Sequence, residues 1–296
     1  MSLPLVSVVV ASLDTDGLQE CLASLSATNY APSRREILVV GADHAGRTQR
    51  IVETHSATYI RGDANSVTAA RNRGIAESRG EIVAFTDPDC VVSHTWLREL
   101  VKPFAEREVG AVAGAILPYP PRTPAERYMA RRRSHTQERP MAYATRPFAM
   151  TPNLAFRRDV FDGIGVFDTR FPGGGWEDAD LCWRFNETSA RRLVYAPRAA
   201  VFHRYRATTS AFVVQQYRYG YGLGVLTRKY KRELPDEWRA RAGSAAELAS
   251  SLLSLAVAAM RTVRQREHEE LSACCFDVLR LLGQRSGYWV ASVMSQ

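Results

Sequence analysis

Short apolar runs alternate with helical patterns along the first 110 residues of the chain. Residues 5–11 form an unbroken, valine-rich run, which is typical of a strand buried on both faces of a sheet. Further strands are predicted at 36–41, 58–60 and 81–86, and helices at 18–25, 48–53 and 65–78. This order predicts a parallel sheet with helices on both faces, whose ligands bind at the carboxyl ends of the strands.

The remainder of the chain is irregular at first and then helical. The pattern predicts strands at 111–117, 151–156, 192–195 and 199–203, with a proline-rich loop after residue 117. It also predicts a helix at 209–230 that is interrupted by Gly220, Gly222 and Gly224. Most of 236–296 is expected to be amphipathic helix. We therefore expect one α/β domain over residues 1–230, with halves at 1–110 and 111–230, and a C-terminal amphipathic helical extension over 231–296.

Composition indicates a globular protein in a reducing compartment. The chain has 296 residues, of which 46% are apolar. No run approaches the roughly 18 apolar residues that span a bilayer, and the N-terminus lacks the pattern of a signal peptide. The five scattered cysteines do not suggest a disulfide framework. We expect a cytoplasmic location, with peripheral contact at the inner face of a membrane as the alternative.

The net charge of +8 indicates an anionic partner. The densest basic patch is Arg131-Arg132-Arg133. Three interpretations stay open for it, namely a solvated arginine-rich surface, a site for an anionic substrate, and a contact with membrane headgroups. Nucleic acid is not expected as a partner, because no nucleic-acid-binding motif accompanies the charge.

Two acidic clusters carry the candidate chemistry. Asp87-Pro88-Asp89 follows the strand at 81–86, and Gly173-Gly174-Gly175-Trp176 leads into Glu177-Asp178. Two aspartates one residue apart can bind a hard cation together with a substrate phosphate. A carboxylate beside a glycine-rich loop can take a proton from a hydroxyl group. The simpler interpretations are an Asp-capped turn and an acidic helix N-terminus.

Three other positions add weaker signals. His203 ends a predicted strand, where a lone histidine is more often structural than a ligand. Arg71, on the helix at 65–78, either reaches a nucleotide or a nearby acid, or lies exposed. Asp180 and Arg184 have the i,i+4 spacing of a helical ion pair. The sequence lacks the motifs of dinucleotide enzymes, P-loop kinases, zinc peptidases and serine hydrolases.

In this order the motifs resemble glycosyltransferase family 2, the inverting enzymes of the GT-A fold, a Rossmann-like, mostly parallel α/β sheet. The collinear matches are residues 6–14, 70–72, 80–89, 151–158, 165–168, 177–181 with Arg184, and His203. Together they cover roughly residues 4–230 of the chain.

The resemblance implies a metal-dependent transferase that moves a sugar from a nucleotide diphosphate sugar to an acceptor hydroxyl by a single displacement. The half at 1–110 would bind the nucleotide sugar, and the half at 111–230 would supply acceptor and catalytic groups. Asp178 would be the general base, Asp89 and His203 would hold Mn²⁺ or Mg²⁺, and Trp176 and Glu177 would shape the acceptor or sugar pocket. The implied nucleotide-sugar residues are Ser12, Leu13, Asp43, Arg71, Asp87, Asp89 and Asn153.

Two departures from the family pattern concern base recognition. The acidic pair that the family usually carries after the second strand is replaced by Val40-Gly41-Ala42-Asp43, and Leu13 occupies a position that is usually polar or aromatic. A UDP-sugar is the favoured donor, with dTDP- and GDP-sugars as alternatives. The acceptor stays open between a glycan, a lipid-linked molecule, a peptide and a small natural product. The extension at 231–296 is expected to pack on the domain, form a homodimer, or lie on a membrane surface.

Two other functions compete with glycosyl transfer. Nucleotidyl transfer uses related folds but normally needs a glycine-rich, lysine-bearing loop after the first strand, and residues 11–17 lack one. A degenerate, non-catalytic module that binds sugar nucleotides or polyanions is disfavoured by the presence of Asp87, Asp89, Asp178 and His203.

Overall fold

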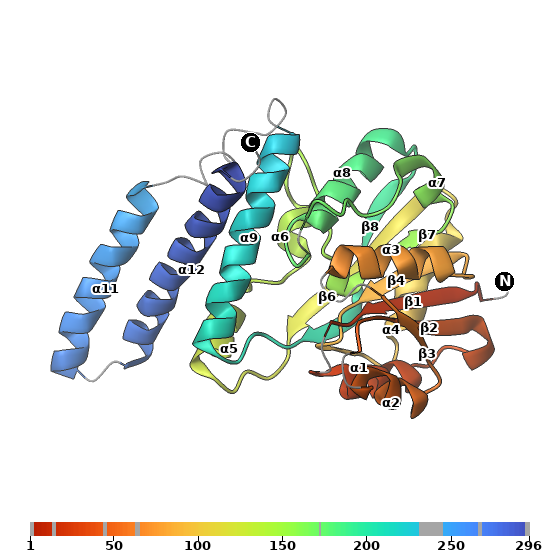
Figure 1. The fold of residues 1–296 in the computed structure, drawn as a ribbon, viewed down its shortest axis with the longest axis horizontal. Coiled ribbons are helices and arrows are strands. Elements are labelled where there is room, and N and C mark those ends of the chain that lie inside the picture. The colour runs from red at the N-terminus through yellow and green to blue at the C-terminus, as the bar shows by residue number, and fades with distance from the viewer. Residues whose placement is uncertain are drawn as a thin grey trace. The chain divides into compact units, whose positions relative to one another are not determined.

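The computed structural model describes residues 3–13, 16–43, 46–62, 66–171, 173–230, 245–265 and 268–293 (Figure 1). Its contacts divide the chain into two compact units. The first consists of Met1–Tyr119, His135–Thr169 and Glu177–Arg204, and the second of Pro120–Ser134, Arg170–Trp176 and Tyr205–Gln296. Each unit is therefore built from three separate segments of the chain. The predicted division instead separated the chain at one position, after residue 230.

The first unit is built on one eight-stranded sheet with the order β3-β2-β1-β4-β7-β6-β8-β5. Its strands are β1 (Val6–Ala11), β2 (Arg35–Gly41), β3 (Thr58–Arg61), β4 (Ile82–Thr86), β5 (Cys90–Val92), β6 (Val109–Pro118), β7 (Leu154–Arg157) and β8 (Arg192–His203). Strands β3, β2, β1 and β4 are parallel, as predicted. Strand β7 runs antiparallel to β4 and β6, and β5 runs antiparallel to β8.

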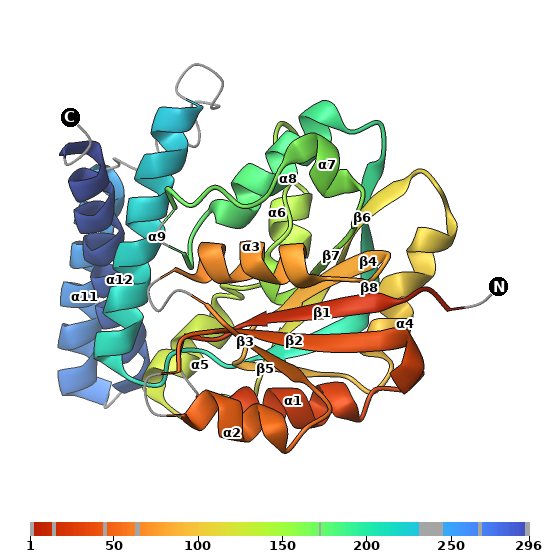
Figure 2. The ribbon, with the colours of Figure 1, turned by 45° about the vertical axis from the view of Figure 1, so that its right-hand side comes forward.

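Helices cover both faces of this sheet (Figure 2). They are α1 (Leu18–Ser26), α2 (Arg47–Glu53), α3 (Val67–Glu77), α4 (Trp96–Val101), α6 (Glu138–Met141), α7 (Val160–Ile164) and α8 (Glu177–Thr188), with 3₁₀ turns at Pro32–Arg34, Lys102–Ala105 and Thr151–Asn153. Every residue of β1 is buried, which explains its continuous apolar sequence. Val8 packs with α1, α2 and α4 in the main core, and Val9 faces α3 on the other side.

Three predictions about the middle of the chain were wrong. The strands expected at 192–195 and 199–203 form the single strand β8, which passes an irregularity where Gly114 and Ala115 of β6 pair with Ala196 and Ala200. The segment 151–156 begins as a 3₁₀ turn and becomes extended only at Leu154. The loop expected after residue 117 contains α5 (Pro124–Arg131), which begins with a capping box between Thr123 and Glu126.

The second unit is helical. Besides α5 it contains α9 (Thr209–Lys229), α11 (Ala245–Gln265) and α12 (His268–Val293), and α12 lies between α9 and α11 (Figure 1). Helix α9 is continuous, so the predicted interruption at its glycines was wrong. A Cβ atom on Gly220 would lie 1.8 Å from the carbonyl oxygen of Gln284, and one on Gly224 would lie 2.6 Å from Cβ of Ala291. These glycines therefore serve the close approach of α12.

The predicted helical extension is only partly described, because residues 231–244 lie outside the described residues. In the parts of the chain that are described, no helix is long and apolar enough to cross a membrane. Leu252 and Leu253 on α11 and Leu282 and Trp289 on α12 are exposed. Peripheral membrane contact and homodimer formation through this region stay predictions.

Candidate active site

The Asp87-Pro88-Asp89 segment forms a tight connection between β4 and β5. The N–H of Cys90 donates to the carbonyl oxygen of Asp87 over 3.1 Å, and the N–H of Arg204 donates to that of Asp89 over 2.9 Å. Gly17 lies against this turn with φ 78°, and a Cβ atom there would lie 2.8 Å from the carbonyl oxygen of Pro88. The backbone therefore holds both aspartates at the carboxyl end of β4, as the topology predicts.

Arg71 joins the two acidic clusters. Its side chain is 4% exposed, and its two terminal nitrogens donate separately, one to Oδ1 of Asp87 at 2.9 Å and the other to Oε1 of Glu177 at 2.7 Å. Burial by itself would lower the pKa of Arg71, but the carboxylates of Asp87 and Glu177 more than offset this effect and raise the pKa. Of the alternatives for Arg71, the structure shows the contact with nearby acids.

Helix α3 carries Arg71 into this position. The helix begins at an N-cap, where Oγ of Ser66 accepts from the N–H of Ala69 over 3.1 Å. It lies close to β1 because Gly74 has no side chain, and a Cβ atom there would lie 2.3 Å from a methyl carbon of Val9. The Arg71 guanidinium also lies over the ring of Phe167, 5.6 Å from its centre.

Asn72 fixes the segment that supplies this ring. Its Nδ2 donates to the carbonyl oxygen of Phe167 over 2.8 Å, and its Oδ1 accepts from the N–H of the same residue over 2.9 Å. The Asn72 side chain therefore joins the matched motifs 70–72 and 165–168 through two hydrogen bonds to the backbone of Phe167.

Asp178 stands in the first turn of α8 and is partly exposed. Its Oδ1 accepts from the N–H of Ala179 over 2.9 Å, and its Oδ2 accepts from the N–H of Thr151 over 3.3 Å. Burial and the neighbouring Glu177 carboxylate raise the pKa of Asp178 to about 7, although Arg71 and the two N–H donors act in the opposite direction. A carboxylate with this pKa can accept a proton near neutral pH.

Asp180 has a different role from its acidic neighbours. It is fully buried, and its Oδ2 accepts from Nε and Nη2 of Arg184 at 3.1 and 3.0 Å. Arg184 also donates to the carbonyl oxygens of Ile164 and Val166. The predicted i,i+4 ion pair is therefore confirmed, and it holds α8 against the segment that follows α7.

Asp89 and His203 come together at the end of β5. His203 is the last residue of β8 and the register partner of Cys90 in β5. Its Nε2 lies 3.5 Å from Oδ1 of Asp89, and its ring stacks on the ring of His135 with a separation of 4.7 Å. A carboxylate oxygen and an imidazole nitrogen this close are a suitable donor pair for a divalent cation such as Mn²⁺.

Ser12 and Leu13 follow β1 at the same end of the sheet. Ser12 is buried, and its N–H donates to the carbonyl oxygen of Val40 over 2.9 Å. Gly41 allows this contact, because a Cβ atom there would lie 1.7 Å from the carbonyl oxygen of Ser12. Leu13 is partly exposed.

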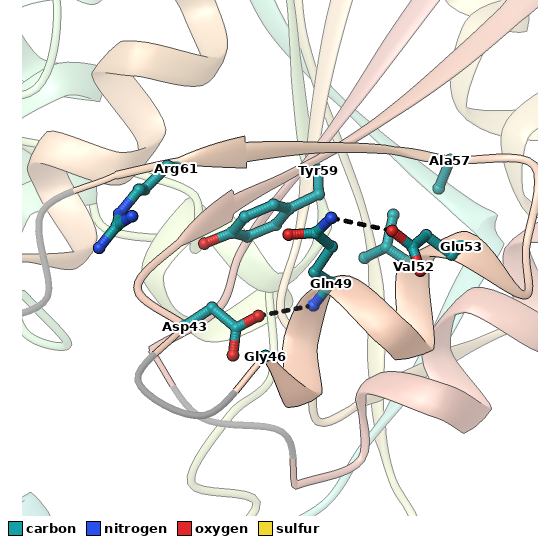
Figure 3. A pocket seen from close by; sticks show the side chains of 8 residues that line it. All are labelled: Asp43, Gly46, Gln49, Val52, Glu53, Ala57, Tyr59 and Arg61. Atoms are coloured by element: carbon teal, nitrogen blue, oxygen red, sulfur yellow. Dashed lines mark hydrogen bonds between the residues drawn. The ribbon is translucent and has the colours of Figure 1, made fainter.

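Asp43 lies at the sheet edge on the wall of a pocket of 530 Å³ (Figure 3). Its carboxylate accepts from the N–H groups of Thr48 and Gln49 over 3.2 and 3.0 Å, so it caps the N-terminus of α2. Tyr59 and Arg61 from β3 line the same pocket. The two N–H groups use one lone-pair site on each carboxylate oxygen, and base recognition by Asp43 stays a prediction.

Two further predicted site residues, Asn153 and Trp176, have side-chain hydrogen-bond partners within the protein. Asn153 is fully buried, its Nδ2 donates to the carbonyl oxygens of Ala115 and Ala199, and its Oδ1 accepts from Nε1 of Trp96. Its amide is therefore used within the protein, which is a structural role. Trp176 belongs to the second unit, has φ 74°, and donates from Nε1 to the carbonyl oxygen of Tyr219 over 2.9 Å.

Sequence reasoning missed the contacts of four residues at the site. The N–H of Thr151 orients Asp178, Asn72 and Phe167 support Arg71, and the His135 ring covers His203. Thr151, Asn72 and Phe167 lie inside matched motifs, but no spacing rule gives their partners. His135 follows the run Arg131-Arg132-Arg133, where charge was the only signal.

Comparison with known proteins yields consistent matches. Glycosyltransferase AglE of Haloferax volcanii is 32% identical over 198 residues, which are 64% of this chain and 63% of AglE. The pre-mycofactocin glycosyltransferase of Mycobacterium tuberculosis is 32% identical over 157 residues, 51% of this chain and 33% of that protein. The chain therefore spans less than two thirds of either relative. A glucosyl-dolichyl phosphate glucuronosyltransferase of Haloferax volcanii is 26% identical and matches 78% of this chain and 80% of that protein.

Solved structures share the fold. The mannosyltransferase PcManGT from Pyrobaculum calidifontis, in complex with GDP-Man and Mn²⁺, superposes with a TM-score of 0.65 at 19% identity over 96% of this chain and 88% of PcManGT. GalNAc-T7 with UDP, GalNAc and Mn²⁺ gives 0.52 at 16% identity over 69% of this chain and 44% of that one. The predicted GT-A fold is thereby confirmed.

The family model described as glycosyl transferase family 2 matches residues 7–165, more than half of the 296-residue chain. The matched region contains the Asp87-Pro88-Asp89 turn and Arg71. This chain belongs to glycosyl transferase family 2.

Proposed function

We propose that the chain is an inverting, metal-dependent glycosyltransferase that moves a sugar from a nucleoside diphosphate sugar to an acceptor hydroxyl. The observation that carries the proposal is the pair of contacts from the buried Arg71 side chain to Asp87 and Glu177. Through them the turn that would bind the donor and the helix that would supply the base meet in one place. Membership of glycosyl transferase family 2 supports this assignment.

Asp89 and His203 are the residues that would hold Mn²⁺ or Mg²⁺. Their donor atoms lie 3.5 Å apart, and both structural neighbours were solved with Mn²⁺. A cation held there would neutralise negative charge on the leaving diphosphate. The chain's own contribution is to hold both ligands on backbone that is fixed by the β5–β8 pairing.

Asp178 is the proposed general base. Arg71 holds the neighbouring carboxylate of Glu177, whereas the partners of Asp178 within the described ranges are the backbone N–H groups of Thr151 and Ala179. Its pKa of about 7 lets it remain a competent proton acceptor at neutral pH without being fully ionised in the resting protein. Attack by the deprotonated hydroxyl in one displacement inverts the anomeric centre, so an α-configured donor gives a β-linked product.

The donor and acceptor are proposed by class. A UDP-sugar is favoured from the resemblance, and the structural neighbours were solved with UDP in one case and GDP-Man in the other. The acceptor is proposed only as a molecule that carries a hydroxyl group. The relatives' names specify different acceptors, from glucosyl-dolichyl phosphate to pre-mycofactocin.

Asp178→Asn should lower the rate of sugar transfer about 10²–10⁴-fold while leaving nucleotide binding intact, because it removes the proton acceptor and little else. Turnover would be measured with each candidate donor and a panel of hydroxyl acceptors. Asp162→Asn, an exposed acid on α7, is the control and should retain transfer at nearly the wild-type rate. Near-normal turnover in Asp178→Asn would remove the base assignment.

Asp89→Ala should abolish the effect of Mn²⁺ on nucleotide binding. The thermal stability of the wild-type protein with UDP, GDP or dTDP should rise further when Mn²⁺ is added, because ligands that bind the native state stabilise it. The variant should show the same stability with and without Mn²⁺ at each nucleotide concentration. Asp162→Asn, an exposed acid on α7, is the control. An undiminished Mn²⁺ effect in Asp89→Ala would refute the ligand role.

Asp178→Asn should also change how stability depends on pH. In the wild-type protein the folded state binds the Asp178 proton with a pKa of about 7, against 3.8 for an ordinary Asp. Stability is therefore lost as the pH rises toward and through 7, and the Asn variant lacks this loss. Relative to wild type, the free energy of unfolding of the variant should rise by about 2.5 kcal/mol between pH 5 and pH 8. Urea unfolding at both pH values measures the difference, and a pH-independent difference would contradict the raised pKa.

A further inference from the structure

The proposed cation site contains a third side chain that glycosyl transfer does not use. The ligand atoms of Asp89, Cys90 and His203 all lie within 4.8 Å of one another. Cys90 is the first residue of β5 and pairs in register with His203, so the two side chains lie on the same face of the sheet. Cys90 is fully buried, and His203 is 4% exposed.

A thiol in this position changes which metals the site prefers. Mg²⁺ and Mn²⁺ favour oxygen ligands and octahedral coordination, and they gain little from sulfur. Zn²⁺ is held by thiolate, imidazole and carboxylate ligands, usually four in a tetrahedron, and three protein ligands with one open position are a common set. Cys90, His203 and Asp89 supply one ligand of each kind.

The Cys90 thiol binds a metal only as the thiolate, so a cation must displace its proton. A weakly thiophilic cation does not displace the thiol proton. A strongly thiophilic cation does, because metal–thiolate binding competes directly with the proton.

We propose that Asp89, Cys90 and His203 form a three-ligand site for thiophilic divalent cations, foremost Zn²⁺, which excludes the catalytic cation and inhibits the protein. This inference rests on the proposed function for the role of Asp89 and His203 in donor binding. On binding, the Cys90 S–H bond breaks, a Zn–S bond forms and the proton passes to solvent, with no change in oxidation state.

Inhibition follows from the number of open coordination positions. A six-coordinate Mn²⁺ held by two protein ligands leaves four positions for diphosphate oxygens and water. A tetrahedral Zn²⁺ held by three protein ligands leaves one. The Zn²⁺-loaded site therefore cannot receive two diphosphate oxygens without losing a protein ligand.

Cobalt provides a direct probe, because Co²⁺ takes similar ligands and its bond to a thiolate absorbs in the near ultraviolet. Titration of the full chain with Co²⁺ should give this sulfur-to-cobalt band in the wild type and in Cys21→Ser. Cys21 is the matched control, since it is also a fully buried thiol but lies outside the three-residue cluster. The band should be lost in Cys90→Ser. To exclude the adjacent pair Cys274-Cys275, every protein compared, including the one that is otherwise wild type, carries serine at both positions.

Zinc affinity gives the second measurement. Zn²⁺ should displace Co²⁺ from the wild type. Cys90→Ser should bind Zn²⁺ at least about tenfold more weakly, because even the loss of a residue that hydrogen-bonds to a metal ligand typically lowers metal affinity by that factor. The ratio of Zn²⁺ to Mn²⁺ affinity should fall in the same variant. If Cys90→Ser does not fold, Cys90→Ala serves instead.

The outcomes separate this inference from the proposed function. Co²⁺ binding without the sulfur band in the wild type, or equal Zn²⁺ affinity in wild type and Cys90→Ser, overturns the thiolate site. Mn²⁺ that strengthens nucleotide binding in the same preparation then leaves the proposed function standing. A sulfur band with no effect of Mn²⁺ on any nucleotide supports the site and removes the donor-binding role.

Discussion

The arrangement of the site depends on one buried guanidinium. Arg71 reaches from α3 to Asp87 after β4 and to Glu177 at the start of α8, residues that are 16 and 106 positions away in the chain. Removing one partner from a buried ion pair costs about 3–5 kcal/mol, because the other charge is left without compensation. Both carboxylates are therefore needed to keep Arg71 buried, and their positions are fixed together.

This constraint divides the work among neighbouring carboxylates. Glu177 and Asp87 compensate Arg71, and Asp180 compensates Arg184. Among the described residues, the partners of Asp178 are backbone N–H groups, and it lies beside the negative charge of Glu177. The carboxylate that lacks a guanidinium is the one whose pKa is raised, which is the property that a general base requires.

The sequence was most informative where the signal is local. Buried valine-rich strands and the alternation with helices predicted β1 to β4 and their parallel order, and i,i+4 spacing predicted the pair of Asp180 with Arg184. The failures concern contacts between distant segments. The glycines of α9 resemble helix breakers until α12 is seen against them, and Asn153 resembles a polar site residue until its buried backbone partners are known. Nor does spacing reveal that Cys90 faces His203, since that follows from the pairing of β5 with β8.

We propose that Arg71 holds Glu177 and leaves Asp178 as the proton acceptor. An NMR titration of the side-chain carboxyl carbons in the wild-type protein and in Asp178→Asn tests this arrangement directly. One carboxyl resonance in the wild type should titrate with a pKa of about 7 and be missing from the variant. If the Asp178 resonance instead titrates near the ordinary Asp value of about 4, the proposed division of roles among the carboxylates is wrong.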